Sequence, residues 1–326
     1  MSQVTAKEHY SSIPPKRRSV NEKSFFQRLW KQMDIQLMVW PGVLLIFIFA
    51  YIPMYGVLTG FMDYNIFTGA NIFENPWVGF KHFEDFFNAP QFWTIMRNTI
   101  VISLLKLLVG FPAPILLAMM LNEVRHRNFK RVIQSITYLP YFMSWVIVGS
   151  IVMSLLSTEN GSVNMLLKGI GAIDESINFL SMKDYFWAIL VSTNVWKDIG
   201  FNSIIFMAAI AGVNPSLYEA AEIDGASRFK QMYLITIPTI MPIIIIFMIL
   251  AMGSLLSAGF EDILILAQNP SLRPVSDVID TYVYRVGLQN QRYDFGVAVG
   301  LFRAVVSVML LTIANYLARR TGNSLW

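Results

Sequence analysis

Six long apolar segments restrict the folds that are open to this chain. They lie at about residues 35–61, 98–121, 136–156, 185–212, 239–257 and 295–318. A helix crosses the ~30 Å hydrocarbon core of a bilayer with about 20 residues. Because lipid offers no hydrogen-bond partner to backbone amides and carbonyls, each spanning segment must be helical. We therefore expect an all-α membrane protein with six transmembrane helices.

The composition agrees with a chain that is partly surrounded by lipid. Apolar residues make up 55% of it and charged residues 14%. The basic excess flanks apolar segments and forms no patch interleaved with aromatic residues, which argues against nucleic-acid binding. Cysteine is absent and His9, His82 and His126 lie far apart, so neither disulfides nor a metal centre is expected. Prolines 41, 53, 112, 114 and 140 lie within or near spans and predict kinks.

The distribution of lysine and arginine predicts the orientation in the membrane. The segments before the first span, after the second, after the fourth and after the sixth carry 15 of these residues, against 7 in the opposite set. Cytoplasmic loops carry the excess. We therefore expect a cytoplasmic tail at 1–34, a six-helix transmembrane domain at 35–318, a cytoplasmic segment at 213–238 and a cytoplasmic tail at 319–326. Phe25 to Trp30 is compatible with either a short interfacial helix or disorder.

The polar segment 213–238 has the pattern of a helical hairpin. Asn214 followed by Pro215 is typical of a helix start. Asp224-Gly225 indicates a turn, and Ser227 can cap a second helix that runs toward the fifth span. The pattern therefore predicts a helix–turn–helix at the cytoplasmic surface.

The residues of this hairpin leave two interpretations open. Small residues at 220, 221, 225 and 226 give a surface that another backbone can approach closely. Glu219 and Glu222 are expected near the positive end of the first helix dipole. The hairpin is either a docking element for a partner protein or an ordinary loop whose alanines are good helix formers.

A family resemblance favours docking. The run from Tyr218 to Ala226, followed by Phe229 and by Ile235-Thr236-Ile237-Pro238, resembles the EAA signature of ABC-importer permeases. Similarity to the sugar-importer branch and its LplB-like polysaccharide and oligosaccharide permeases is carried by Asn194-Val195-Trp196, Gly200-Phe201, Leu288-Gln289-Asn290 and Asp294-Phe295-Gly296. The resemblance covers residues 35 to 318.

The resemblance implies a type I ABC-importer permease fold with a cytoplasmic coupling hairpin. The implied partners are a second homologous permease subunit, two ATPase subunits that hold ATP and Mg, an extracytoplasmic solute-binding protein, the lipid bilayer and the sugar. The implied location is the bacterial cytoplasmic membrane, with multiple spans and both termini cytoplasmic. The residues implied to couple to the ATPase are Glu219, Ala220, Ala221, Asp224, Gly225 and Ala226.

The chain itself is expected to be a transport subunit and not an enzyme. It contains no Gly-x-x-x-x-Gly-Lys-Ser/Thr run, so ATP hydrolysis is assigned to the partner and no cofactor to this chain. A membrane enzyme would need clustered carboxylates at an interface. Glu261-Asp262 is the candidate pair, and we expect it to cap or hydrate the end of the fifth span.

Four ionisable residues fall within predicted spans: Lys106, Lys197, Asp198 and Arg303. Such residues are costly in lipid and should face the bundle with a partner. One interpretation is that Asp198 pairs with Lys106 or Arg303, or with the partner permease. The other is that the cationic excess forms a positive interior that suits an anionic sugar.

The sugar pathway is predicted between the fourth and fifth spans. Sugar sites combine aromatic faces with groups that pair hydroxyls. The candidates are Trp196, Lys197, Asp198, Phe201, Asn202, Ser254 and Ser257. The alternative for the small residues is close helix packing.

The predicted function is the permease subunit of an ATP-driven, binding-protein-dependent importer of oligosaccharide or polysaccharide fragments, with acidic sugars among the candidates. The alternatives are an ABC importer of a different polar solute and an ATP-independent secondary transporter. A secondary transporter would often show inverted repeats.

Overall fold

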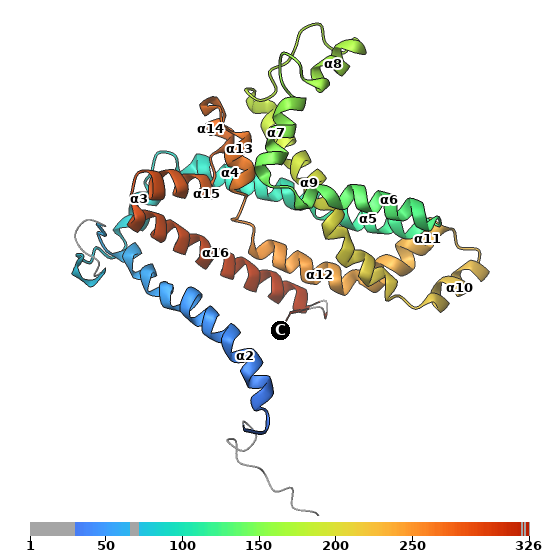
Figure 1. The fold of residues 1–326 in the computed structure, drawn as a ribbon, viewed down its shortest axis with the longest axis horizontal. Helices are drawn as coiled ribbons and strands as arrows, with labels where there is room; N and C mark the ends of the chain where they lie inside the picture. The colour runs from blue at the N-terminus through green and yellow to red at the C-terminus, as the bar shows by residue number, and fades with distance from the viewer. Residues whose placement is uncertain (1–29, 66–71, 321, 323, 326) are drawn as a thin grey trace, which may run out of the picture. The chain divides into compact units, whose positions relative to one another are not determined.

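The regular structure in the described part of the chain is helical. The computed structural model describes residues 30–65, 72–320, 322, 324 and 325 (Figure 1). Most of the expected tail at 1–34 and nearly all of the interfacial helix considered at Phe25 to Trp30 lie outside these residues. The chain divides into a unit at Met1–Tyr55 and a unit at Gly56–Trp326. The first unit contains α2 (Met33–Ile46) and the π-helical turn η1 (Phe47–Tyr51), and η2 (Ile52–Phe61) leads from it into the second.

The second unit contains the remaining helices. Its first half comprises η3 (Ile72–Glu74), α3 (Lys81–Phe87), α4 (Phe92–Leu105), η4 (Lys106–Gly110), α5 (Pro112–Glu123), α6 (Arg127–Tyr138), η5 (Leu139–Phe142), α7 (Trp145–Leu155) and α8 (Ser162–Gly169). Its second half comprises α9 (Lys183–Ala211), α10 (Pro215–Ile223), α11 (Arg228–Gln231), η6 (Met232–Thr236), α12 (Ile237–Gly253), α13 (Glu261–Leu266), η7 (Pro270–Leu272), α14 (Arg273–Ser276), α15 (Ile279–Val283), η8 (Tyr284–Gln289) and α16 (Tyr293–Arg319). Helix α9 packs on α5 and α6, and α12 packs on α16 (Figure 1).

Four described helices are long and apolar enough to cross a membrane. They are Met33–Phe61, Phe92–Glu123, Arg228–Gly253 and Tyr293–Arg319. Two bent pairs pass the same test together: Arg127–Phe142 with Trp145–Leu155, bent by 106°, and Lys183–Ala211 with Pro215–Ile223, bent by 72°. The described helices therefore provide between four and six spans.

The third expected span, 136–156, is not one straight helix. Helix α6 ends at Tyr138 and η5 at Phe142, and Met143 is extended. Ser144 then caps α7 by accepting a hydrogen bond from the Ile147 amide at 3.4 Å. Pro140 lies in the 3₁₀ turn before this break. Pro140 and Ser144 are the sequence features that indicate this break. The prediction missed it because the apolar run continues through both residues.

Prolines also explain three changes of helix type. The π-helical turns η1, η4 and η6 end two residues before Pro53, Pro112 and Pro238, respectively. A proline ring clashes with the carbonyl four residues earlier, and in each case this carbonyl belongs to the middle residue of the π turn. The wider turn accommodates the ring without ending the helix. Each change of helix type therefore follows from the position of a proline.

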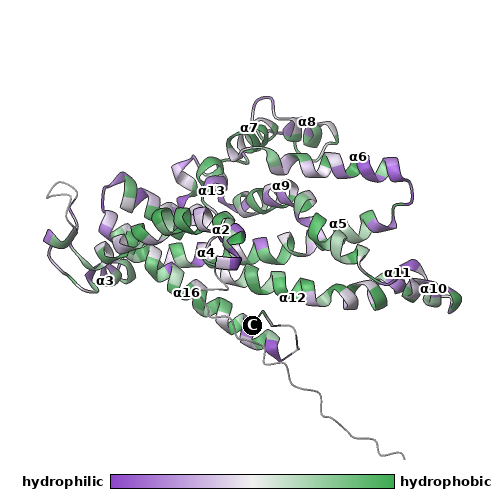
Figure 2. Ribbon diagram, turned by 60° about the horizontal axis from the view of Figure 1, so that its bottom comes forward, coloured by the Kyte–Doolittle hydropathy of each residue, from purple (hydrophilic) through white to green (hydrophobic). Residues whose placement is uncertain are grey.

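Three buried clusters connect the helices of the second unit. One joins α4, α9 and α13 around Ile102, Leu190 and Ile263. The second joins α3, α4, α15 and α16, and the third joins α5, α9 and α12. Figure 2 shows hydrophilic residues at α10, α11 and the start of α6, whereas α12 is mostly hydrophobic. The polar ends and apolar middles match the distribution expected for a membrane bundle.

Gly200 allows α9 to lie directly against α6, and this contact is testable. A Cβ at Gly200 would collide with the Thr137 carbonyl, whereas a Cβ at Gly300 would meet nothing within 4 Å. Gly200→Ala should therefore destabilise the protein by about 1–3 kcal/mol, as overpacking does. Gly300→Ala should be neutral or stabilising, because alanine favours a helix over glycine. Thermal unfolding midpoints of the purified proteins measure the stability of the two variants. Equal midpoints would contradict this packing.

Candidate functional site

The predicted hairpin between α9 and α12 has the expected caps. Asn214 Oδ1 accepts a hydrogen bond from the Ser216 amide at 3.1 Å at the start of α10, and Pro215 occupies the first turn. Gly225 has φ +70° in the turn, and the Ser227 side chain accepts a hydrogen bond from the Lys230 amide at 3.4 Å. Helix start, turn and second cap are thus confirmed. We call residues 214–231 the hairpin.

The expected position of the two glutamates was wrong. The first turn of α10 contains no acidic residue, because the helix begins at Pro215 and Glu219 is its fifth residue. Glu222 is one residue from its C-terminal end. Favourable interaction with the helix dipole is confined to the first turn. The glutamates therefore do not stabilise α10 through its dipole.

Contacts on both sides fix the hairpin to the bundle. The Tyr218 and Thr236 hydroxyls are 2.9 Å apart, which joins α10 to the start of the fifth long helix. The buried Gln231 donates from Nε2 to the Ala226 carbonyl at 3.0 Å. Arg228 forms an ion pair of 2.8 Å with Glu123 at the end of α5. The hairpin is therefore linked to the helices on either side of it.

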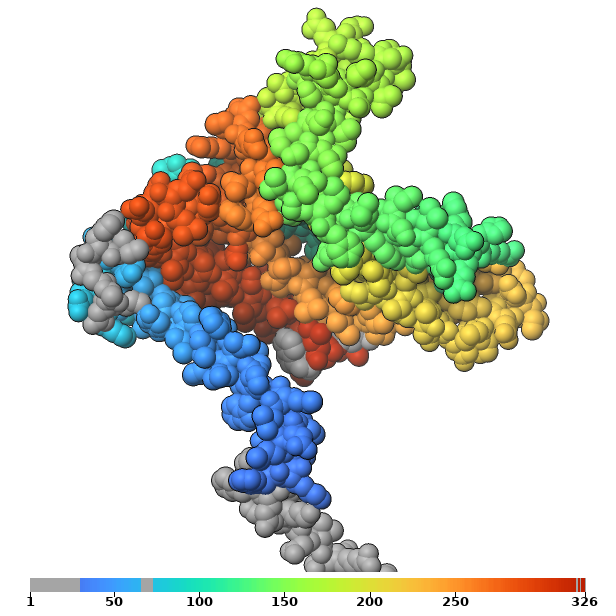
Figure 3. Space-filling view, viewed as in Figure 1, coloured from blue at the N-terminus to red at the C-terminus, as the bar shows by residue number. Residues whose placement is uncertain are grey.

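The face of the hairpin is uncovered by the rest of the described chain (Figure 3). Glu219, Ala220, Asp224 and Gly225 are exposed, and Ala221 and Ala226 are half-buried. Two large apolar side chains lie among them, with Ile223 87% and Phe229 74% exposed. Sequence reasoning did not single out Ile223. A Cβ on Gly225 would meet nothing within 4 Å, so only its positive φ requires glycine within this chain.

A buried ion pair joins the short helix α13 to two membrane helices and was not anticipated. Lys106 Nζ, at the start of η4, lies 2.5 Å from Asp262 Oδ2 and donates to the Ala258 carbonyl at 2.6 Å. Asn194 on α9 donates to the same carboxylate at 3.0 Å. The expectation that Asp262 caps or hydrates the end of the fifth span was wrong, because Asp262 is 3% exposed. Its carboxylate connects α13 to η4 and α9.

The expected pairing of Asp198 with Lys106 or Arg303 was also wrong, and its pairing with the partner permease stays a prediction. Asp198 lies within electrostatic range of Lys106 and Asp262 but forms no ion pair with a described residue. Arg303 pairs instead with Asp280. The segment 258–292 thus supplies the acids that neutralise Lys106 and Arg303, which removes the basis for a strongly positive interior.

Lys197 and Phe201 contact the break in the third span and not a cavity. The Lys197 ammonium, on a side chain that is nearly buried, donates to the Tyr141 carbonyl at 2.8 Å. It also lies 5.2 Å and 5.5 Å from the ring centres of Tyr141 and Trp145. Phe201 stacks on Tyr141 with 3.8 Å between ring centres. Trp196 on the same helix is exposed.

Two adjoining cavities lie between η4, α5, α9 and α12. One, of about 230 Å³, is lined by Ser103, Lys106, Leu107, Phe111, Ala251, Ser254, Leu255 and Ser257. The other, of about 390 Å³, is lined by Gly110, Phe111, Pro114, Asn202, Ile205, Phe206, Phe247, Leu250, Ala251 and Ser254. Of the predicted pathway residues, Asn202, Ser254 and Ser257 line these cavities. Trp196, Lys197, Asp198 and Phe201 do not.

Ser103 and Lys106 are the polar groups on the α4–η4 side of these cavities. Neither was among the predicted pathway residues, although Lys106 was one of the cations considered for a positive interior. The Ser103 hydroxyl is buried without a hydrogen-bond partner in the described part of the chain. An unpaired buried hydroxyl costs free energy. Among the described residues there is no acid–histidine group that could hold a metal ion.

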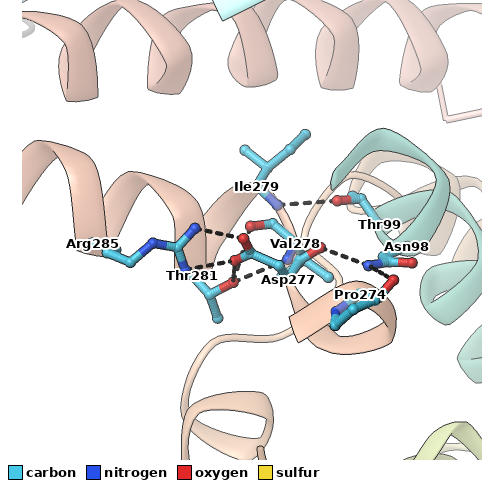
Figure 4. A network of polar contacts seen from close by, with 8 residues as sticks. All are labelled: Asn98, Thr99, Pro274, Asp277, Val278, Ile279, Thr281 and Arg285. Atoms are coloured by element: carbon cyan, nitrogen blue, oxygen red, sulfur yellow. Dashed lines mark hydrogen bonds and ion pairs between the residues drawn. The ribbon is translucent and has the colours of Figure 1, made fainter. Parts of the chain in front are cut away.

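A second polar network holds the segment after α13 against α4 (Figure 4). The Arg285 guanidinium donates to both oxygens of Asp277, at 3.0 and 2.5 Å, and this pairing raises the pKa of Arg285. Asn98 on α4 donates to the Asp277 carbonyl at 3.0 Å, and the Thr99 hydroxyl accepts from the Ile279 amide at 3.0 Å. Burial raises the pKa of the neighbouring Tyr282. The network fixes the start of α15 on α4.

The buried pair Lys106–Asp262 can be tested by a double-mutant cycle. Lys106→Met alone should cost about 3–5 kcal/mol, because it leaves a buried carboxylate without its cation. Asp262→Leu alone should also destabilise. The double variant should be no less stable than Lys106→Met, since the unpaired charge is gone. Denaturation of the purified proteins in detergent measures all three, and additive losses would contradict the pairing.

Comparisons with known proteins agree with this geometry. The family described as binding-protein-dependent transport system inner membrane component matches residues 110–323. The polygalacturonan/rhamnogalacturonan transport system permease protein YteP of Bacillus subtilis (strain 168) is 41% identical over 92% of each chain. Protein LplB of the same organism is 42% identical over 91% of this chain and 92% of its own.

A solved structure extends the similarity to the fold. A bacterial alginate ABC transporter, in complex with an alginate pentasaccharide-bound periplasmic protein, contains a chain that is 39% identical, with a TM-score of 0.83. The match covers 92% of this chain and 99% of that one. The family match at 110–323 includes the hairpin and every residue that lines the larger cavity.

Proposed function

The chain belongs to the family of binding-protein-dependent transport system inner membrane components, and we propose that it is one permease subunit of an ATP-driven importer of oligosaccharide or polysaccharide fragments. It is a multi-pass membrane protein and a transport subunit. YteP is named for the transport of polygalacturonan and rhamnogalacturonan, and a second similar solved structure, 40% identical, is of a bacterial ABC transporter involved in the import of the acidic polysaccharide alginate. These relatives favour a carbohydrate over other polar solutes.

The observation that supports the coupling part of the proposal is the rigid hairpin with its uncovered face. Small residues from Ala220 to Ala226 let another backbone approach, and the exposed Ile223 and Phe229 provide apolar anchors. A face of this kind suits a protein partner, because buried apolar and aromatic anchors supply most binding energy. The partner is an ATPase subunit. The complete importer holds two, which bind ATP and Mg, with the second copy on the second permease.

The links of the hairpin provide a mechanical path to the cavities. Its second helix continues through η6 into α12, and Tyr218 is tied to Thr236 at the start of that helix. Its first helix follows α9 after a bend of 72°. Both α9 and α12 line the larger cavity. When the ATPases close on ATP, the hairpin moves and therefore changes the spacing of the cavity walls. The permease thus has two states, and nucleotide shifts the equilibrium between them.

The cavities are the proposed sugar path. Serine and asparagine side chains at Asn202, Ser254 and Ser257 offer hydrogen bonds to sugar hydroxyls, and Phe111 offers an aromatic face shared by both cavities. The second permease subunit closes the path from the other side. Trp196, Lys197, Asp198 and Phe201 line neither cavity, so this proposal does not include them in the path.

The orientation follows from the charge bias. The excess of lysine and arginine places the hairpin and both termini on the cytoplasmic side of a bacterial membrane. The segments 62–97, 157–184 and 258–292 then face outward, where the solute-binding protein delivers the sugar.

Two glycines in the same strained conformation provide a matched test of the hairpin. Gly225 and Gly171 both have φ +70°, and a Cβ at either would meet nothing within 4 Å, but only Gly225 lies on the hairpin. Gly225→Trp should leave the permease inserted, abolish co-purification of the ATPase and lower uptake at least about tenfold, the loss expected when 1.4 kcal/mol or more of binding is removed. Gly171→Trp should retain both co-purification of the ATPase and normal uptake. Uptake into proteoliposomes measures the difference, and normal uptake by Gly225→Trp would rule out the coupling role.

A further inference from the structure

A third cavity lies in the segment 258–292, apart from the proposed path. It measures about 210 Å³ and shares no lining residue with the other two cavities. Its walls come from α13, from η7 and α14, and from α15 and η8. The lining residues are Ile263, Leu264, Ala267, Gln268, Pro270, Arg273, Ser276, Asp277, Thr281, Tyr284, Arg285 and Gln289.

The charged groups of this cavity leave an unused cationic surface. It contains two guanidinium groups, Arg273 and Arg285, and one carboxylate, Asp277. The pairing of Arg285 with Asp277 is end-on and uses two N–H groups, whereas a guanidinium has five. The Arg273 side chain is exposed and forms no hydrogen bond or ion pair with any described residue. One net positive charge and several free donors therefore face the cavity.

The position of Arg285 is fixed before any ligand arrives. Asp277 holds both of its terminal nitrogens, and its guanidinium lies 5.6 Å from the Tyr282 ring centre. Thr281 donates to Asp277 Oδ1 at 2.9 Å, and Asn98 holds the Asp277 backbone, as Figure 4 shows. A donor that is already immobile loses little conformational entropy on binding.

The other lining groups match the remainder of a sugar. The amides of Gln268 and Gln289 can each donate and accept hydrogen bonds, as sugar hydroxyls require. Tyr284 offers an aromatic ring at the wall. The volume is below the ~300–1,000 Å³ of sites that hold drug-sized ligands, so it suits one sugar unit and not a long chain.

We infer that this cavity binds one carboxylated sugar unit of the incoming oligosaccharide, with Arg273 and the free edge of Arg285 pairing with the carboxylate. Planar guanidinium groups bind carboxylates with two parallel hydrogen bonds. The inference rests on the proposed function as a carbohydrate importer and on the outward orientation of segment 258–292. Within the spans, Asp262 and Asp280 neutralise Lys106 and Arg303, so these two cations are not free to bind an acidic sugar. We therefore assign the preference for acidic sugars to segment 258–292.

The test compares an acidic sugar with its neutral ester on the assembled importer. The complex, in lipid nanodiscs without its solute-binding protein, is titrated with trigalacturonate and with the trimethyl ester at one ionic strength. The wild type should bind the acid more tightly than the ester. Arg273→Gln should weaken binding of the acid about tenfold and leave the ester unchanged, as expected for loss of one charge-assisted pair. Arg273→Lys keeps the charge but loses the two parallel hydrogen bonds of the guanidinium, so its affinity for the acid should be intermediate.

Lys168→Gln is the control, because it removes one positive charge from the same side of the membrane outside the cavity. It should change neither affinity. Equal affinity of the wild type for acid and ester, no measurable binding of either, or an unchanged affinity in Arg273→Gln would each overturn the site. Weaker docking of the solute-binding protein to Arg273→Gln with unchanged acid binding would also overturn it, and would assign Arg273 to an acidic side chain of that protein.

Uptake separates a failure of this site from a failure of the proposed function. The wild-type complex with its solute-binding protein and ATP is assayed in proteoliposomes with acidic and neutral oligosaccharides. Uptake of neither would refute the carbohydrate importer itself. If the complex takes up carbohydrate but the titration contradicts the site, only the site is refuted and the carbohydrate importer stands.

Discussion

The need to satisfy backbone hydrogen bonds in lipid governs this structure. Irregular backbone at membrane depth is tolerated only where protein or a cavity surrounds it. Three prolines force π-helical turns, and one of these turns, η4, lines both proposed path cavities and begins at Lys106. The break in the third span is covered by Lys197, which donates to the Tyr141 carbonyl. One irregular turn of the bundle therefore forms part of both cavities, and a buried lysine holds the break in the third span.

The charges follow from the same constraint. An ionised group in lipid needs a partner, and in this chain the acids come from segment 258–292. Asp262 reaches Lys106 and Asn194, Asp280 reaches Arg303, and Asp277 reaches Arg285. This segment therefore links α4 and η4, α9 and α16, although its sequence is that of a connection between two spans. Movement of these helices relative to the segment strains an ion pair at η4 or α16, or a hydrogen bond at α4 or α9, so the segment and the bundle are coupled.

Local signals made much of the fold and the hairpin predictable. The apolar runs predicted a helical membrane protein, and Asn214, Pro215, Gly225 and Ser227 predicted caps and turn correctly, because each acts on its nearest neighbours. The Lys106–Asp262 pair joins residues 156 positions apart, and no local pattern reports such a contact. The same holds for the collision that Gly200 avoids at Thr137. Lys197 and Phe201 were assigned to the pathway because they are polar or aromatic within a span, yet they contact the broken third span.

The central claim is that nucleotide on the ATPase subunits opens and closes the cavity at Ser254 through the hairpin. Cysteine is absent from the chain, so Ser254→Cys gives a single reactive thiol on the wall shared by both cavities. The measurement is the rate at which a membrane-impermeant thiol reagent, added from the outside, labels this residue in the assembled importer. Trapping the ATPases with ATP should raise the rate severalfold over the nucleotide-free state. A rate independent of nucleotide would contradict the account.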